Sequence, residues 1–296
     1  MKRETIFGCY LIAMIAAGCG TGGQVYTDIR SESDGIFSYK LGQFMVYTLV
    51  DAQRQGNTGI LIGADAAILE RLIPENGFSH STNAFLIRTP QQNILVDAGF
   101  GNTIFEKMQT LGVTPEQIDA VLITHLHGDH IGGLQRDGAA RFPNAKIYLS
   151  AKELEYFTQT QVNQGAVAAL APYISAGNVS AFDPAGFGST LSEILPGIKP
   201  IANYGHTPGH TAFLVESGRD KLLLAGDFLH VALVQFPFPE ISATFDINPN
   251  TAAASRKQIL EYAAVNRIPV GGMHIVYPAI GNVEADGNGF KFIPTN

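Results

Sequence analysis

Residues 124–133 carry the side chains that are best suited to metal chemistry. Their sequence, Thr-His-Leu-His-Gly-Asp-His-Ile-Gly-Gly, places three histidines and one aspartate within six positions. Neutral imidazole nitrogens and carboxylate oxygens are ligands that zinc and similar divalent ions accept. At a period of two, His125, His127 and Asp129 would point in different directions around a helix, so a strand end opening into a loop fits better. We therefore expect a metal site here, with a polar, histidine-rich surface loop as the alternative.

Three more candidate ligands lie far along the chain, each just after an apolar segment. Strand ends gather at one edge of a sheet, where the loops converge. Seven ligands exceed the needs of one tetrahedral ion and suit two ions that share a carboxylate, for which Asp227 is the candidate. The expected ligands of two divalent ions, with zinc as the expected metal, are His125, His127, Asp129, His130, His206, Asp227 and His274.

Two other histidines are expected to have different roles. His210, four residues after His206, is expected to orient backbone groups and not to bind metal. His80 is expected to be a surface or hydrogen-bonded histidine.

The apolar pattern around these residues predicts one layered α/β domain over residues 41–296. Residues 159–187 are interpreted as a helical insertion or lid, and residues 20–40, which are polar and rich in Gly and Ser, as an N-terminal arm. The expected strands are residues 44–50, 83–88, 93–96, 120–124, 146–149, 198–204, 211–215, 221–224, 270–273 and 290–293. The expected helices are residues 66–72, 104–111, 151–158 and 251–265.

Residues 1–19 have the composition of an export signal. A basic start precedes an apolar stretch, residues 6–17, that is short for a bilayer span. The Ala-Ala-Gly-Cys sequence that ends at Cys19 is similar to a bacterial lipoprotein cleavage box, which predicts a lipid anchor and a periplasmic, membrane-anchored location. Ordinary signal-peptidase cleavage near Gly18 is the alternative. Cys9 and Cys19 are the only cysteines, so the metal site must consist of His and Asp.

Composition limits the class of partner. The chain has 296 residues, 46% of them hydrophobic, which is enough for a full core. The formal net charge of -7 argues against nucleic acid, because phosphate binding needs a basic surface. A small molecule is the expected partner.

The motifs together resemble those of the metallo-β-lactamase superfamily. The matching segments are residues 125–130, residues 205–210 (Gly-His-Thr-Pro-Gly-His), Gly226-Asp227, His274 and Asp97 in Val-Asp-Ala-Gly. The resemblance implies an αββα sandwich with a dinuclear site at one edge. It also implies that one ion binds His125, His127 and His206, that the other binds Asp129, His130 and His274, and that Asp227 bridges.

Residues 226–236 and 277–290 are similar to the methyl parathion hydrolase branch, which is itself similar to lactonases. Class B β-lactamases lack the bridging aspartate, and glyoxalase II carries a C-terminal helical domain for which the chain after His274 is too short. The resemblance implies a hydrolase that opens lactones or cleaves related esters through a metal-bridging hydroxide, with a homodimer as a possible assembly, and the N-terminal segment predicts its export. Organophosphate triester hydrolysis as the main activity, or metal binding without catalysis, are the alternatives.

The resemblance also suggests which residues contact the substrate. Lactonases have a tyrosine three residues after the bridging aspartate that helps to hold the substrate carbonyl; this chain has His230, whose imidazole could donate the same hydrogen bond. Asp129 is the expected carrier of the proton to the leaving alkoxide. Core packing is the alternative role for the aromatic residues. The expected pocket residues are Phe100, Phe228, His230, Phe236 and Phe245.

Overall fold

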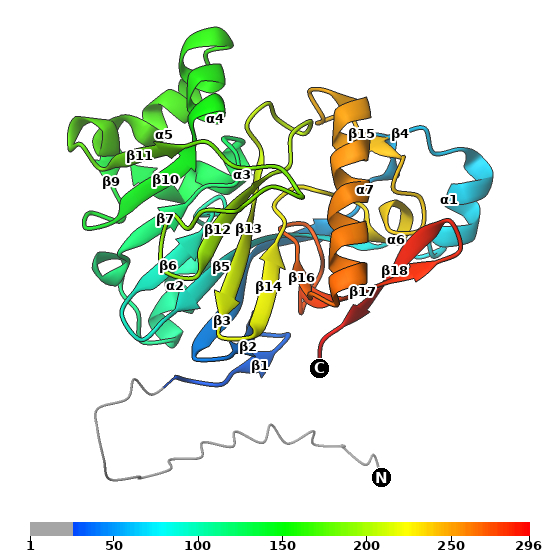
Figure 1. Cartoon of the computed structure of the whole chain (residues 1–296), viewed down its shortest axis with the longest axis horizontal. Coiled ribbons are helices and arrows are strands. Elements are labelled where there is room, and N and C mark those ends of the chain that lie inside the picture. Colours follow the sequence, from blue (N-terminus) through cyan, green and yellow to red (C-terminus); the bar gives the residue numbers. More distant parts are fainter. Residues whose placement is uncertain (1–25) are drawn as a thin grey trace, which may run out of the picture.

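The apolar segments between the candidate ligands form two β-sheets that pack face to face (Figure 1). The structure, a computed structural model, describes residues 26–296. The first sheet has eight strands in the order β1-β2-β3-β5-β6-β7-β10-β11, and the second has six in the order β12-β13-β14-β16-β17-β18. Helices cover the outer faces, so the α/β class and the αββα sandwich predicted from the sequence are confirmed.

The two sheets contain strands of two to twelve residues, of which β3 is the longest. The first sheet contains β1 (Arg30–Ser31), β2 (Ile36–Leu41), β3 (Phe44–Gln55), β5 (Ser79–Arg88), β6 (Asn93–Val96), β7 (Ala120–Leu122), β10 (Lys146–Ser150) and β11 (Val179–Phe182). The second contains β12 (Ile198–Ala202), β13 (Thr211–Ser217), β14 (Asp220–Leu224), β16 (Val270–Gly271), β17 (Ile280–Asp286) and β18 (Gly289–Pro294). Two small ribbons pair β4 (Leu61–Ile62) with β15 (Ser242–Ala243), and β8 (Gln135–Arg136) with β9 (Ala139–Ala140).

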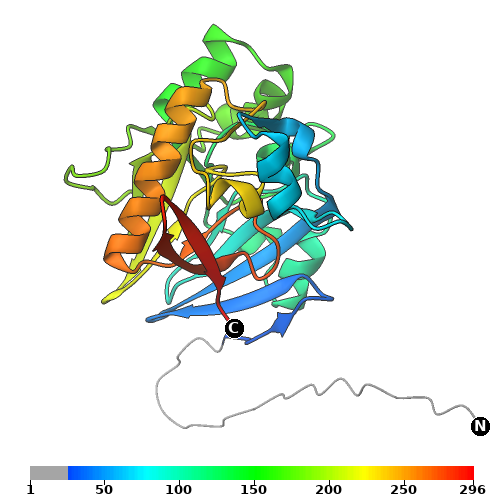
Figure 2. The same ribbon diagram turned by 90° about the vertical axis from the view of Figure 1, so that its right-hand side faces the viewer.

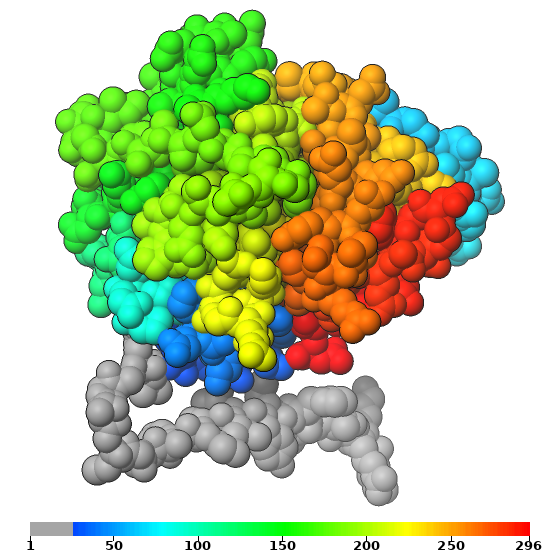
Figure 3. Space-filling view, viewed as in Figure 1, coloured from blue at the N-terminus to red at the C-terminus, as the bar shows by residue number. Residues whose placement is uncertain are grey.

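The helices are α1 (Ala66–Leu72), α2 (Ile104–Thr110), α3 (Gly128–Ile131), α4 (Ala151–Glu155), α5 (Gln164–Ser175), α6 (Ala232–Gln235) and α7 (Pro249–Asn266). One apolar core lies between the two sheets and continues beneath α7; a second lies between the first sheet and helices α2 and α5. On the face in Figure 3, α7 and the C-terminal strands form a continuous surface. Figure 2 shows α6 between α7 and α1, and α1 contacts α6.

Parallel pairing brings the ligand-bearing loops to one edge. Strands β6, β7, β10 and β11 are parallel to one another, and β14 is parallel to β16. Because parallel strands end at the same edge of a sheet, the residues that follow β7, β14 and β16 lie close together. The fold therefore places the candidate ligands on converging loops.

Two boundaries differ from the sequence prediction. The expected N-terminal arm is wrong for residues 30–31 and 36–40, because β1 pairs with β2, and β2 pairs with β3 and buries Ile36 and Phe37. The expected insertion at residues 159–187 is instead part of the αββα framework. Helix α5 buries Leu170 and Tyr173 in the second core, and β11 extends the first sheet.

The expected signal peptide, including Cys9 and the proposed lipidation site Cys19, lies outside the described residues. Within residues 26–296, the helices are too short or too polar to cross a bilayer.

Candidate metal centre

The seven candidate ligands lie in the segments that follow four different strands. Residues 125–127 form the loop after β7, and α3 then carries Asp129 and His130. His206 follows β12, Asp227 follows β14 and His274 follows β16. The sequence prediction that strand ends would bring these residues together agrees with their positions.

His125, His127 and His206 form the first group of donor atoms. The Nε2 atom of His206 lies 3.0 Å from His127 Nδ1 and 3.2 Å from His125 Nε2. His206 Nδ1 donates a hydrogen bond to Asp246 Oδ1 at 2.9 Å, which leaves a lone pair on Nε2. Burial lowers the pKa of His206 to about 3 and that of His125 well below its usual value, so both rings are neutral near pH 7. Three converging neutral nitrogens suit a metal ion.

Asp129, His130 and His274 form the second group, with one donor atom from each within 4.8 Å of the others. His274 Nδ1 donates to the Ser81 carbonyl oxygen at 2.8 Å, so Nε2 faces Asp129 Oδ2 at 3.5 Å. His130 Nε2 is buried without a hydrogen-bond partner among the described residues. Burial opposes a charge on His274, yet Asp227 and Asp129 raise its pKa above its usual value. This half of the site therefore favours a cation.

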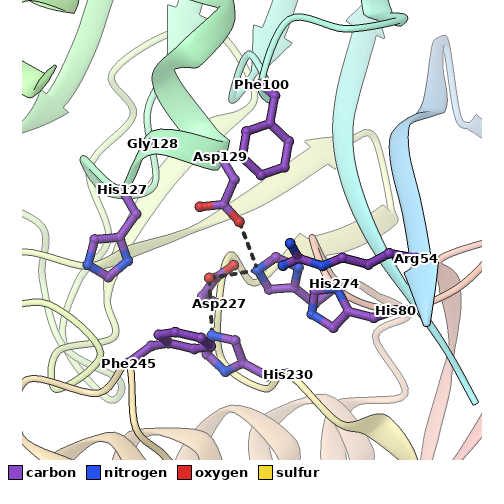
Figure 4. Close-up of a pocket in the computed structure, with 10 residues that line it drawn as sticks. All are labelled: Arg54, His80, Phe100, His127, Gly128, Asp129, Asp227, His230, Phe245 and His274. Atoms are coloured by element: carbon purple, nitrogen blue, oxygen red, sulfur yellow. Dashed lines mark hydrogen bonds and ion pairs between the residues drawn. The ribbon is translucent and has the colours of Figure 1, made fainter. Parts of the chain in front are cut away.

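Asp227 lies between the two groups (Figure 4). Its Oδ2 atom is 2.9 Å from His274 Nε2 and 3.4 Å from His206 Nε2, and its buried Oδ1 atom lies 3.2 Å from His130 Nε2 without a hydrogen bond. Burial favours the neutral carboxyl, but the imidazoles, His130 first, lower the pKa of Asp227 well below its usual value. An ionised carboxylate that reaches both groups could bridge two cations. The residues present thus fit the pair of divalent ions predicted from the sequence.

Behind Asp227, His210 supports the loop and lies outside both donor groups, in the role expected for it. The Asp227 N–H donates to His210 Nε2 at 2.9 Å, and His210 Nδ1 donates to the Asn203 carbonyl oxygen at 2.8 Å. Gly226 has a φ of +60°, and a Cβ atom there would lie 2.4 Å from His210 Nε2. Only glycine combines this backbone conformation with this close approach.

Asp97 fixes the orientation of His130. Its fully buried carboxylate accepts hydrogen bonds from His130 Nδ1 at 2.7 Å, from Thr124 Oγ1 at 2.7 Å and from the Thr124 backbone N–H at 2.8 Å. With its proton held on Nδ1, His130 keeps a lone pair on Nε2 for a metal.

Glu153 on α4 joins two ligand loops, a role that the sequence analysis missed. Its fully buried carboxylate accepts hydrogen bonds from the Leu126 N–H at 2.9 Å, from Thr207 Oγ1 at 2.7 Å and from the Gly209 N–H at 2.9 Å. Leu126 lies between two histidines of the first donor group, and Thr207 directly follows the third. Glu153 therefore holds that group together from behind. A lone glutamate in an amphipathic helix gives no sequence signal for such a role.

We expect Glu153→Gln to lower the free energy of unfolding of the metal-free protein by about 1–3 kcal/mol, because the amide leaves one buried N–H without an acceptor. Burial raises the pKa of Glu153 from 4.5 to about 7, although its hydrogen bonds, Thr207 first, oppose the shift. A carboxyl whose pKa is raised on folding loses stability as the pH rises through that range. Urea unfolding should therefore show that Glu153→Gln lowers the free energy of unfolding by more at pH 5 than at pH 8. An equal cost at both values would contradict the assignment.

A cavity of about 290 Å³ opens above the donor groups. Three predicted pocket residues, Phe100, His230 and Phe245, line it. The prediction is wrong for Phe228 and Phe236, which are buried in the core between the sheets and pack edge-on against each other. Their apolar rings fill space that the two sheets enclose, so the core-packing alternative holds for both.

Arg54 and His80 also line the cavity, and the sequence analysis missed both. The prediction for His80 is wrong: it is only 7% exposed, and its Nδ1 atom has no hydrogen-bond partner among the described residues. Its ring instead packs against His274, with 4.5 Å between ring centroids. A register argument about β3 and β5 could have placed the two residues side by side, but the irregularity in β3 was not visible in the sequence.

His230 faces the donor groups from the loop before α6. Its Nε2 atom lies 3.4 Å from Asp227 Oδ2, and its ring stacks on His274 with centroids 5.1 Å apart. Gln235 Oε1 accepts hydrogen bonds from the backbone N–H groups of His230 and Val231, at 2.7 and 2.9 Å, and so fixes this loop. His230 is therefore placed to contact a ligand bound over Asp227.

Comparison with known proteins agrees with this geometry. A family model described as the metallo-beta-lactamase superfamily matches residues 79–266. The N-acyl homoserine lactonase of Bacillus cereus is 26% identical over 154 residues, which are 51% of this chain and 54% of that protein. Several curated relatives are covered over only 33% to 60% of their own length.

Solved structures extend the similarity to almost the whole described chain. The hydrolase AbOPH, described as belonging to the beta lactamase superfamily, has a TM-score of 0.80 and is 27% identical, covering 91% of this chain and 99% of that chain. AidC, described as a dizinc quorum-quenching lactonase, has a TM-score of 0.75 over 90% of this chain and 99% of that chain. At 24% identity, AidC shows a shared fold.

Proposed function

Because the chain belongs to the metallo-beta-lactamase superfamily, we propose that it is a metal-dependent hydrolase that opens lactones or cleaves related carboxylic esters. The observation that carries the proposal is the meeting of two donor groups at Asp227 on the floor of a cavity with aromatic side chains. The similarity to a named N-acyl homoserine lactonase supports the lactone class. Zinc is the proposed metal, because all the donor atoms are imidazole nitrogens or carboxylate oxygens and the similar fold of AidC is described as dizinc.

When bound, two divalent ions lower the pKa of water and withdraw charge from a carbonyl oxygen. In the proposed arrangement His125, His127 and His206 would hold one ion, Asp129, His130 and His274 would hold the other, and Asp227 would be shared. Hydrogen bonds fix the first three ligands. Asp246 holds Nδ1 of His206, and Glu153 holds the Leu126 N–H between His125 and His127, which keeps the lone pairs of the three rings directed at the site. The protein therefore holds these donor atoms in position before a metal ion binds.

Asp129 is the proposed proton carrier. It lines the cavity, and its side chain is 20% exposed, so a substrate can reach it. Burial favours its neutral form, but His130 and His274 lower the pKa of Asp129 below its usual value. The ionised carboxylate can accept a proton from the attacking water and then give it to the oxygen of the leaving alkoxide.

His230 is the proposed donor to the substrate carbonyl. As water attacks, the carbonyl oxygen gains negative charge, and an N–H on His230 Nε2 can stabilise it. We expect His230→Ala to lower kcat by about 10²–10³-fold with little change in KM, because the hydrogen bond is strongest in the transition state. Steady-state kinetics check this, and His230→Tyr should restore part of kcat by supplying a hydroxyl donor.

Metal analysis of the His230→Ala variant separates two roles for this histidine. His206, Asp227 and His230 also have donor atoms within 4.8 Å of one another, so His230 could instead be a ligand. Unchanged metal content with reduced kcat supports the donor role. Loss of an ion from the variant would contradict it.

A substrate panel tests the reaction class. Purified zinc-loaded protein should open lactones and cleave aryl esters, and chelation should remove both activities. A diethyl aryl phosphate should turn over more slowly; much faster turnover would favour a phosphotriesterase, the alternative that the motif resemblance suggests. Bound metal without turnover of any of these compounds would favour a non-catalytic metal-binding protein and overturn the proposal.

Export is a separate proposal. The composition of residues 1–19 supports an exported protein that is anchored in the membrane through lipid on Cys19. Cell fractionation of the wild type and of Cys19→Ser tests it: the substitution should release the protein from the membrane fraction without preventing export. Retention of both proteins in the cytoplasm would contradict the proposal.

A further inference from the structure

The wall of the cavity formed by Arg54 and His80 has no role in the proposed reaction. The two residues are directly opposite each other in the register of β3 and β5. Directly opposed residues of antiparallel strands have side chains on the same face. Figure 4 shows both side chains on the right of the cavity, beside His274, whereas Phe245 lies on the left.

A β-bulge at Asp51 creates this pair. The register shifts between Val50 and Ala52, so β3 has one extra residue relative to β5. If Asp51 instead paired regularly with Thr82, Arg54 would lie opposite Ser79, and its side chain would point to the other face of the sheet. The Asp51 carboxylate accepts hydrogen bonds from the backbone N–H groups of Phe100, Thr103 and Ile104, at 2.7 to 3.1 Å, which fixes the bulge. The fold thus turns Arg54 into the cavity by a specific, well-bonded irregularity.

The hydrogen-bonding capacity of this wall is unused. Within residues 26–296, no carboxylate lies within ion-pair distance of the Arg54 guanidinium, which is exposed and carries the only fixed positive charge lining the cavity. His80 is more than nine-tenths buried, and its Nδ1 atom has no partner there. A guanidinium presents a planar fork of N–H donors that matches a carboxylate.

We propose that Arg54, assisted by His80, binds a carboxylate of the substrate, so that the preferred substrates are lactones or esters that carry an anionic group beside the bond to be cleaved. The half-exposed rings of Phe100 and Phe245 take the apolar part of the same molecule. The chain has a net charge of -7, so a positive side chain at this wall favours the approach of an anionic substrate. This inference rests on the proposed hydrolase function and adds the substrate class to it.

Two matched substrates test the proposal: the 4-nitrophenyl monoester of glutaric acid and the analogue in which a carboxamide replaces the free carboxylate. Both accept hydrogen bonds, but only the first is charged. For zinc-loaded protein, Arg54→Gln should raise KM for the carboxylate ester by about tenfold to a hundredfold, since a charge-assisted hydrogen bond is lost, and change KM for the carboxamide by less than about threefold. The KM of Arg54→Lys for the carboxylate ester should lie between those of the wild type and Arg54→Gln, because lysine keeps the positive charge but lacks the planar pair of N–H donors.

The control is Arg219→Gln, which removes an exposed arginine outside the cavity lining and should change neither KM. Calorimetric titration with glutarate gives a readout independent of turnover. Arg54→Gln should raise the Kd for glutarate by the same factor by which it raises KM for the carboxylate ester. If Arg54→Gln raised KM equally for both esters, or for neither, the carboxylate subsite would be contradicted. If the wild type cleaves neither ester, the proposed function fails, and glutarate binding to wild type and Arg54→Gln still decides the subsite.

Discussion

Replacing Asp227 with alanine is expected to lower kcat/KM on a lactone or aryl ester by on the order of 10⁴-fold, which corresponds to about 5 kcal/mol of transition-state stabilisation. The carboxylate reaches His274 at 2.9 Å and His130 at 3.2 Å, and it lies between the two donor groups. Without it the two ions would share no side chain, and the negative charge that offsets their mutual repulsion would be lost. The bound metal should therefore fall from two ions per chain to one or none.

Kinetics and elemental analysis on one preparation of Asp227→Ala measure both effects. Asp183→Ala, which removes an exposed aspartate, is the matched control and should keep both ions and full activity. The backbone of residue 227 is held by His210, so the alanine variant should keep its loop conformation. Two retained ions together with more than a tenth of the wild-type activity would show that Asp227 does not bridge.

Replacing Asp97 with alanine should lower the free energy of unfolding by about 3 kcal/mol or more and weaken metal binding by about 10–100-fold. The substitution removes a fully buried acceptor of three hydrogen bonds and leaves the His130 Nδ1–H and the Thr124 backbone N–H without their acceptor. Once released, His130 can move its proton to Nε2 and lose the lone pair that a metal needs.

Urea unfolding and zinc titration against a competing chelator measure the two effects of Asp97→Ala. Asp97→Asn serves as the conservative partner. Its carbonyl can still accept from Thr124, but its NH₂ group faces His130 Nδ1, so stability should recover more than metal affinity. If the alanine variant unfolds like the wild type, Asp97 does not have the structural role that its hydrogen bonds indicate.

The metal centre was largely predictable because its residues follow a local rule. Residues 125–130 crowd four donors into six positions, and His206, Asp227 and His274 each end an apolar segment. Parallel strands bring such ends to one edge, so the cluster follows from strand order. The alternation of strands and helices indicates a layered α/β domain, and the motif resemblance implies the αββα order of the layers.

The rest of the cavity depends on features that leave no pattern in the sequence. Arg54 reaches the cavity through one extra residue at Asp51, and a bulge of this kind changes the face of every later side chain in the strand. Phe228 and Phe236 lie close to Asp227 in the chain but turn into the core, whereas Phe245, farther along, turns outward. Proximity to a ligand in the sequence does not determine which face of a loop is exposed.

Crystals of the zinc-loaded protein, measured on both sides of the zinc absorption edge, test the central claim most directly. We predict two anomalous peaks per chain, one among His125, His127 and His206 and the other among Asp129, His130 and His274, with the Asp227 carboxylate between them. A single peak, or zinc bound away from Asp227, would contradict the dinuclear site on which the proposed hydrolysis depends.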